Sequence, residues 1–213
     1  LSPAALERLT IEMNQGGGAT KSEFRRVPLP QTRLQRLLVN PASPFRDNTQ
    51  VRGAVSAALQ ADRSAASIVP PTVTGSVPSF PVGGQPSIPE VGGQRPRLTL
   101  GFTAKAPGQR DLAGLIRDRL EESAGVSVLL QPDSTDADLI LTDRPAWVNT
   151  AFGWLQPYVD DTLPGSQAKV DDLVRNARST PDAATRAALL AEIQQQAAVD
   201  LTVLPQSLGT ETL

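Results

Sequence analysis

The stretch that decides the fold is FRDNTQVRGAVSAALQADR, residues 45–63. Asp47 or Asn48 can accept hydrogen bonds from the first N–H groups of a helix, and small or apolar residues then recur at helical spacing. This spacing predicts a short amphipathic helix over 47–62 with one face turned to a core. The residues expected on that face are Val51, Ala54, Val55, Ala58 and Leu59.

The chain before this helix predicts two further elements. Residues 2–14 indicate a helix that begins at Ser2 and Pro3 and ends at the glycines of 16–18. Residues 33–39, RLQRLLV, predict a strand that leads into Asn40 and Pro41.

After the helix, residues 69–96 are rich in Pro and Gly and show almost no periodicity. Pro removes backbone donors and Gly raises the entropy of the unfolded chain, so we expect a surface loop. Spaced apolar residues favour a loop that wraps the surface rather than one that only connects. These anchors are Ile68, Val73, Val77 and Phe80.

Residues 97–142 carry the clearest pattern for regular structure. Strands are predicted at 98–103 and 126–131, with a helix at 109–123 between them that stops at Gly125. Such a βαβ unit has parallel strands. A third buried strand is predicted at 138–143. The helix is expected to face inward through Leu112, Leu115, Ile116 and Leu120.

The end of the chain predicts helices at 167–178 and 182–199 and a short strand at 201–205. Their expected inner faces are Val170, Leu173, Val174 and Ala177, followed by Ala183, Arg186, Leu190, Ile193 and Ala197. The pattern as a whole indicates the α/β class, with a mixed or parallel sheet flanked by helices. We expect one lobe made of residues 1–68, the loop 69–96, and residues 97–213.

Composition excludes several classes of function. The chain has no Cys and no His, which removes disulfides, thiolate chemistry, His-based triads and nearly all zinc sites. A net charge of −2 argues against nucleic acid as a partner. No stretch approaches the run of about 18 apolar residues that spans a membrane. We therefore expect no enzyme activity, no cofactor and no metal site.

Both Trp residues and the only Tyr lie in AWVNTAFGWLQPY, residues 146–158. One interpretation is a binding cleft, because aromatic side chains give large and rigid contact areas. The other is an apolar cluster that pins a long loop to the sheet. The residues alone leave both open.

The order of the segments resembles the C-terminal lobe of the family 5 extracellular solute-binding proteins, which serve peptide and nickel ABC transporters. The similar segments are LLVNPASPFRDNTQVRGAVSAALQADR (37–63), TVTGSVPSF (72–80), residues 98–131 and residues 170–207. The resemblance implies a periplasmic-binding-protein-like (type II) lobe and a ligand held in a cleft between two lobes. It also implies a mature fragment of a longer extracytoplasmic protein, with any lipid anchor outside this chain.

One segment departs from the family pattern. Where the family usually carries an acid that meets the amino terminus of a bound peptide, this chain has TDRPAWVN (142–149), with Trp147 near the position of the acid. Loss of one partner of a desolvated ion pair costs about 2–5 kcal/mol, so peptide capture by the usual route is in doubt. The expected ligand-binding residues are Asp143, Trp147, Asn149 and Trp154.

Two functions follow from this resemblance. A mycobacterial lipoprotein that is a variant of the family without the motif is assigned to phosphatidylinositol mannoside and lipoarabinomannan biosynthesis, and the Arg- and Ala-rich composition suits an actinobacterial source. The first hypothesis is therefore a non-enzymatic envelope lipoprotein in glycolipid biosynthesis. The alternative is the substrate-binding receptor of a peptide ABC transporter. The expected partners are a small solute, peptide or glycolipid in the cleft, or envelope proteins, with the chain a monomer.

Overall fold

The computed structural model describes residues 31–210 apart from 85–94, 107, 144–145 and 147. The helix predicted at 2–14 lies outside the described residues. Within them, no helix is long and apolar enough to cross a membrane.

A five-stranded sheet forms the centre of the lobe, in the order β3-β2-β4-β1-β5. β2 pairs in parallel with β3 and with β4, whereas β1 pairs antiparallel with β4 and β5. The sheet is therefore mixed, as the sequence predicts. The strands are β1 (Gln31–Val39), β2 (Arg97–Phe102), β3 (Ser127–Pro132), β4 (Leu139–Thr142) and β5 (Val203–Thr210).

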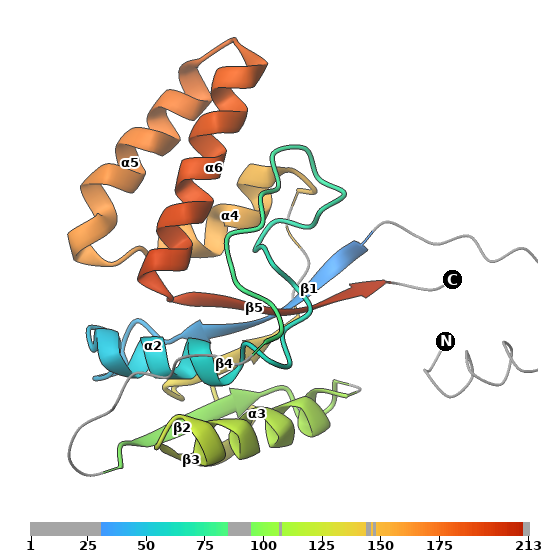
Figure 1. Ribbon diagram of the computed structural model, residues 1–213, viewed down its shortest axis with the longest axis vertical. Coiled ribbons are helices and arrows are strands. Elements are labelled where there is room, and N and C mark those ends of the chain that lie inside the picture. The colour runs from blue at the N-terminus through green and yellow to red at the C-terminus, as the bar shows by residue number, and fades with distance from the viewer. Residues whose placement is uncertain (1–30, 85–94, 107, 144–145, 147, 211–213) are drawn as a thin grey trace, which may run out of the picture.

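The described helices form two groups around this sheet. α3 lies beside β2 and β3 with α2 next to it, and the group of α4, α5 and α6 lies at the β5 end (Figure 1). The helices are α2 (Thr49–Ala58), α3 (Gln109–Ser123), α4 (Ala151–Asp160), α5 (Pro164–Ser179) and α6 (Ala183–Asp200).

The helix of residues 45–63 forms as predicted, although it is shorter. The Asn48 side chain caps α2 by accepting a hydrogen bond from the Val51 N–H at 3.1 Å. All the residues expected on its inner face are buried, at 0–3% exposure. Propensity and periodicity therefore suffice for this element.

The inner face of α3 differs from the prediction at one residue. Leu115 is 48% exposed, and the fully buried apolar residues are Ala113, Ile116 and Leu120. Ile116 and Leu120 are one turn apart on one stripe, and Leu115 precedes that stripe by about 100°. Ala113 lies three residues before Ile116 and therefore on the same buried stripe.

The first turn of α6 also differs from the prediction. Ala183 is exposed and Arg186 is half-buried, while Leu190, Ile193 and Ala197 are buried as expected. The amino-terminal part of α6 therefore packs less deeply than its carboxyl-terminal part.

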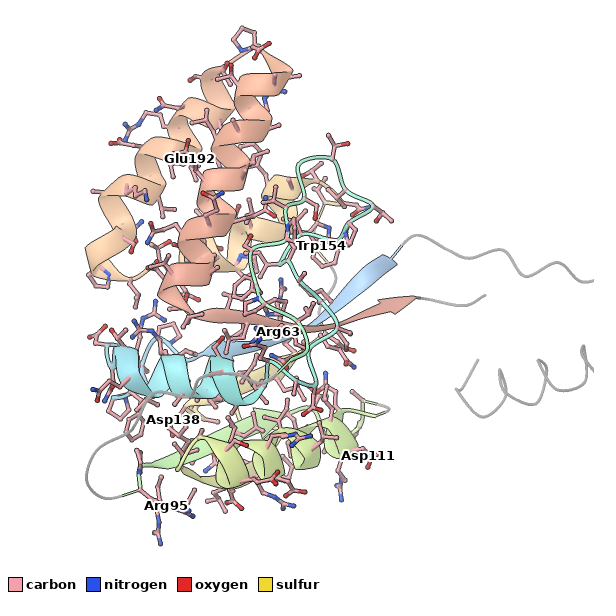
Figure 2. All side chains as sticks on the ribbon, viewed as in Figure 1. Arg63, Arg95, Asp111, Asp138, Trp154 and Glu192 are labelled. Atoms are coloured by element: carbon pink, nitrogen blue, oxygen red, sulfur yellow. The ribbon has the colours of Figure 1, made fainter. Side chains whose placement is uncertain are left out.

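Arg63, the last residue of the stretch 45–63, is a buried donor to backbone carbonyls. Arg63 is 3% exposed and donates to the carbonyls of Pro205 (3.1 Å), Pro81 (3.0 Å) and Ser56 (3.0 Å). Its guanidinium also lies 5.7 Å from the centroid of the Phe80 ring. Burial lowers the pKa of Arg63 to about 10. Arg63 thus joins the end of α2, the Pro-rich loop and β5 (Figure 2).

The described part of the Pro-rich loop, residues 69–84, contains no helix or strand and wraps the surface as expected. Its main polar anchor is the fully buried Gln194 of α6. The Gln194 oxygen accepts from Ser67 Oγ (2.9 Å) and Val77 N (3.1 Å). Its amide nitrogen donates to the carbonyls of Gly75 (2.7 Å) and Leu190 (3.1 Å). The division of the lobe at residues 69–96 stays a prediction.

We predict that Arg63→Met destabilises the lobe by about 2–4 kcal/mol, because two buried carbonyls and one partly buried carbonyl lose their donor. Urea denaturation followed by circular dichroism measures the free energy of unfolding.

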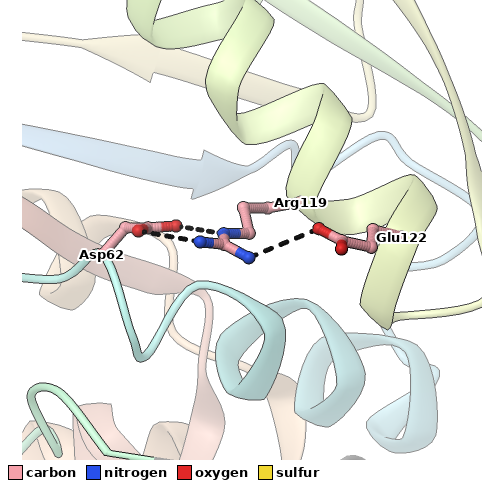
Figure 3. Close-up of polar contacts among 3 residues, drawn as sticks. All are labelled: Asp62, Arg119 and Glu122. Atoms are coloured by element: carbon pink, nitrogen blue, oxygen red, sulfur yellow. Dashed lines mark hydrogen bonds and ion pairs between the residues drawn. The ribbon is translucent and has the colours of Figure 1, made fainter.

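The matched control is Arg119→Met. Arg119 pairs with Asp62 at 2.6 Å and with Glu122 at 3.3 Å, and its side chain is 39% exposed (Figure 3). Exposed ion pairs contribute at most about 1 kcal/mol, so this variant should stay close to the native protein. Equal losses in the two variants would contradict the role given to Arg63.

Candidate ligand-binding site

The carboxyl ends of the parallel strands β2, β3 and β4 meet at one edge of the sheet. Thr103, Asp133 and Asp143 follow these strands directly. Ligands of open α/β sheets bind outside the carboxyl ends of the strands, because loops and free backbone groups gather there. Asp138 marks the opposite end of β4, well away from Trp154 (Figure 2). A ligand site is therefore expected at this carboxyl edge.

A groove of about 520 Å³ lies at the carboxyl edge. Its charged lining combines the buried Arg36 with the exposed carboxylates of Asp133, Asp160 and Asp161. The groove therefore carries more negative than positive side chains. The full lining is Arg36, Leu38, Phe102, Thr103, Asp133, Ser134, Thr135, Ile140, Leu141, Thr142, Pro157, Asp160 and Asp161.

Asp133 ties the ends of β2 and β3 together. Its backbone N–H donates to the Phe102 carbonyl (2.7 Å), and its Oδ1 accepts from the Ala104 N–H (2.9 Å). Its φ of 56° is in the left-handed region that Asn and Asp tolerate best. Gly101 permits the close approach of this turn, since a Cβ there would lie 2.4 Å from the Ser134 carbonyl oxygen.

The segment between β4 and α4 is held by short-range contacts. Trp154 Nε1 donates to Asn149 Oδ1 at 2.9 Å, and Thr150 Oγ1 accepts from the Gly153 N–H at 3.3 Å. The backbone at Val148 passes so close to Gly153 that a Cβ on Gly153 would lie 2.0 Å from the Val148 carbonyl oxygen. These contacts fix Asn149 at the start of α4.

The other end of α4 is held by the buried carboxylate of Asp200, which is 4% exposed. This carboxylate accepts from Tyr158 Oη (2.6 Å), Ser166 Oγ (2.8 Å) and Gln196 Nε2 (2.9 Å). Burial, together with the hydrogen bond to Asp200, raises the pKa of Tyr158. Asp200 thus joins α4, α5 and α6, and its position sets where α4 meets the carboxyl edge.

The predicted site residues that the structure describes differ in how exposed they are. Asp143 is half-buried just after β4, Asn149 is exposed, and Trp154 is only 1% exposed. Trp147 lies outside the described residues. The structure brings Asn149 and Trp154 together through their hydrogen bond, and Trp154 acts there as a core residue that orients Asn149. The described residues show no group of three or more acidic side chains able to hold a metal ion.

Sequence reasoning missed Asp133, Asp160 and Asp161 as lining residues of this site. Asp133 could have been found, because it directly follows a predicted parallel strand. Asp160 and Asp161 could not, since the sequence analysis did not predict α4 and instead treated 146–158 as a possible long loop. Gly153 and Pro157 inside that segment disfavour a helix by propensity, and tertiary packing overrides them.

No protein-family model and no curated protein sequence matches the chain. Solved structures do match. An oligopeptide-binding protein of clavulanic acid biosynthesis shares 17% identity with a TM-score of 0.77 over 99% of this chain and 46% of its own. The periplasmic murein tripeptide-binding protein MppA in its unliganded open form shares 16% identity with a TM-score of 0.74, over 96% of this chain and 46% of its own.

A third match is the dipeptide-binding protein of Pseudoalteromonas sp. SM9913 in complex with Met-Leu. It shares 18% identity with a TM-score of 0.72, over 96% of this chain and 47% of its own. These likenesses show that the chain has the fold of a substrate-binding protein lobe. The chain spans about half the length of each of these structures.

We predict that Gly153→Ala destabilises the lobe by about 1–3 kcal/mol, because the new methyl group would overlap the Val148 carbonyl. Amide chemical shifts of residues 148–150 should move at the same time. Thermal unfolding and nuclear magnetic resonance (NMR) spectra measure the two effects.

Gly114→Ala is the matched control, since Gly114 also lies within a helix and a Cβ there would meet no atom within 4 Å. This variant should gain up to about 1 kcal/mol from helix propensity. A Gly153→Ala protein as stable as Gly114→Ala would show that the contact with Val148 is not required.

Proposed function

We propose that this chain is a ligand-binding lobe of an extracytoplasmic substrate-binding protein for peptides. The observation that carries the proposal is the groove at the carboxyl edge, in a fold shared with lobes of peptide-binding proteins. A lobe of this kind acts by binding and release, with no chemical step. A second lobe would close the site from the other side.

The lining of the groove supports a ligand with a positively charged group, such as a free amino terminus. Asp133 and Asp160 each have one carboxylate oxygen engaged within the chain, by Ala104 N and by Gln156 Nε2. Their second oxygens can accept hydrogen bonds from a ligand ammonium group, and such charge-assisted bonds are the strongest of their kind. These carboxylates would replace the acid that the family motif carries where this chain has Trp147.

Asn149 supplies a second recognition group in this proposal. Because Trp154 occupies its Oδ1, Asn149 offers a ligand its amide NH₂ as a donor. A peptide carbonyl or carboxylate oxygen is the matching acceptor. We propose that Asp143 and Trp147 complete the contact surface, with Trp154 holding Asn149 in place.

The peptide alternative has more support than the role in mycobacterial glycolipid biosynthesis. The similar structures described above are peptide-binding proteins by their own descriptions. The glycolipid role rests only on the departure from the family motif and on composition. An extracytoplasmic location agrees with the periplasmic neighbour MppA, and attachment through a lipid outside this chain stays part of the proposal.

We predict that the chain binds tri-alanine weakly, with a dissociation constant in the millimolar range or about −4 kcal/mol, because one lobe supplies only half of a cleft. N-acetylation of the peptide should abolish binding, since it removes the ammonium charge. Asp133→Asn should weaken binding several-fold while keeping the left-handed turn. NMR titration measures each affinity.

The control is Asp118→Asn, which removes an exposed carboxylate of α3 that does not line the groove. It should leave the affinity unchanged. Equal affinity for the acetylated peptide would contradict the charge argument. Tighter binding of phosphatidylinositol mannoside than of any peptide would favour the glycolipid role instead.

A further inference from the structure

A second groove lies where the start of α4, the end of α5 and the start of α6 meet the loop at Gly75. Its volume is about 470 Å³, within the range of about 300–1,000 Å³ of small-molecule pockets. It shares no lining residue with the groove at the carboxyl edge. Its lining is Thr74, Gly75, Thr150, Ala151, Phe152, Ala177, Arg178, Ala183, Arg186, Ala187 and Leu190.

Alanines make the hollow and give it an apolar floor. Ala183 and Ala187 are one turn apart on α6, and Ala177 faces them from the end of α5. Their small side chains leave space where larger ones would bring the helices and the loop into contact. Leu190 and Phe152 extend the apolar surface. The floor suits the hydrocarbon part of a ligand.

Two arginines give the groove a positive charge. Arg178 is exposed, and its guanidinium lies 5.7 Å from the centroid of the Phe152 ring, which holds it over the groove. No carboxylate of the described residues forms an ion pair with it. Arg186 is half-buried and oriented by a hydrogen bond from Nη2 to the Thr180 carbonyl at 2.6 Å. Both cations are thus held in position beside an apolar surface.

We propose that this groove binds an amphipathic small-molecule carboxylate, with the anionic head between Arg178 and Arg186 and the hydrocarbon part on the alanine floor. A planar carboxylate matches the donor fork of a guanidinium. Asp182, the N-cap of α6, interacts electrostatically with Arg186, so we expect the ligand to carry a single negative charge. Hydrogen bonds from Thr185 lower the pKa of Asp182, so its carboxylate would repel a second charge.

Titration of the full chain with decanoate, followed by NMR, tests the proposal. Binding should be saturable and should shift the amides of Gly75, Ala151 and Ala187, while those of Thr103 and Asp133 at the carboxyl edge stay in place. This map separates the second groove from the proposed peptide site, so either proposal can fail without the other. Decanol should bind at least about tenfold more weakly, because it lacks the charge.

Arg178→Gln should weaken decanoate binding about tenfold, and Arg178→Lys should recover part of the loss. Arg175→Gln is the matched control, since Arg175 lies on the same helix, is 70% exposed and does not line the groove. Absence of saturable binding to the native chain would overturn the proposal. It would also be overturned if Arg175→Gln weakened binding as much as Arg178→Gln, or if decanol bound as tightly as decanoate. Chemical-shift changes confined to the carboxyl edge would overturn it as well. Tighter binding of an apolar peptide through its free C-terminus would also overturn it.

Discussion

The buried carboxylate of Asp200 is the interaction on which the arrangement of the site depends. It accepts hydrogen bonds from one residue each of α4 and α5 and from Gln196 on its own helix. The Asp200 backbone carbonyl also accepts from Arg52 Nε at 2.7 Å, which connects the same residue to α2. A buried charge is tolerated only when hydrogen bonds replace its water. The helices must therefore keep the positions that satisfy Asp200.

This constraint separates the scaffold from the binding surface. Arg52 and Arg63 donate to backbone carbonyls inside the lobe, so these two arginines of the stretch at 45–63 serve the fold. The carboxylates that we propose meet a peptide lie at the carboxyl edge, on Asp133 and Asp160. The residues at 45–63 that resemble the family are thus different from the residues at the carboxyl edge that we propose bind a ligand.

Local patterns predicted much of the fold and less of the site. Helices with regular apolar spacing, such as α2 and α5, form where expected. Burial of their apolar face offsets the conformational entropy that the chain loses when it is ordered. Leu115 was wrongly predicted to face inward and α4 was not predicted, because both depend on the angle at which a helix meets the sheet and on contacts distant in sequence. The buried role of Trp154 likewise depends on packing. Asp160 and Asp161 reach the groove only through the fold of α4.

Hydrogen–deuterium exchange of the full chain, with and without a saturating peptide, tests most directly whether the carboxyl edge is the binding surface. We expect added protection at residues 102–104 and 133–135, which line or adjoin the groove, and none at 45–63, where the backbone is already part of the scaffold. Protection confined to 45–63, or to the outer face of α3, would contradict the assignment of binding to the carboxyl edge.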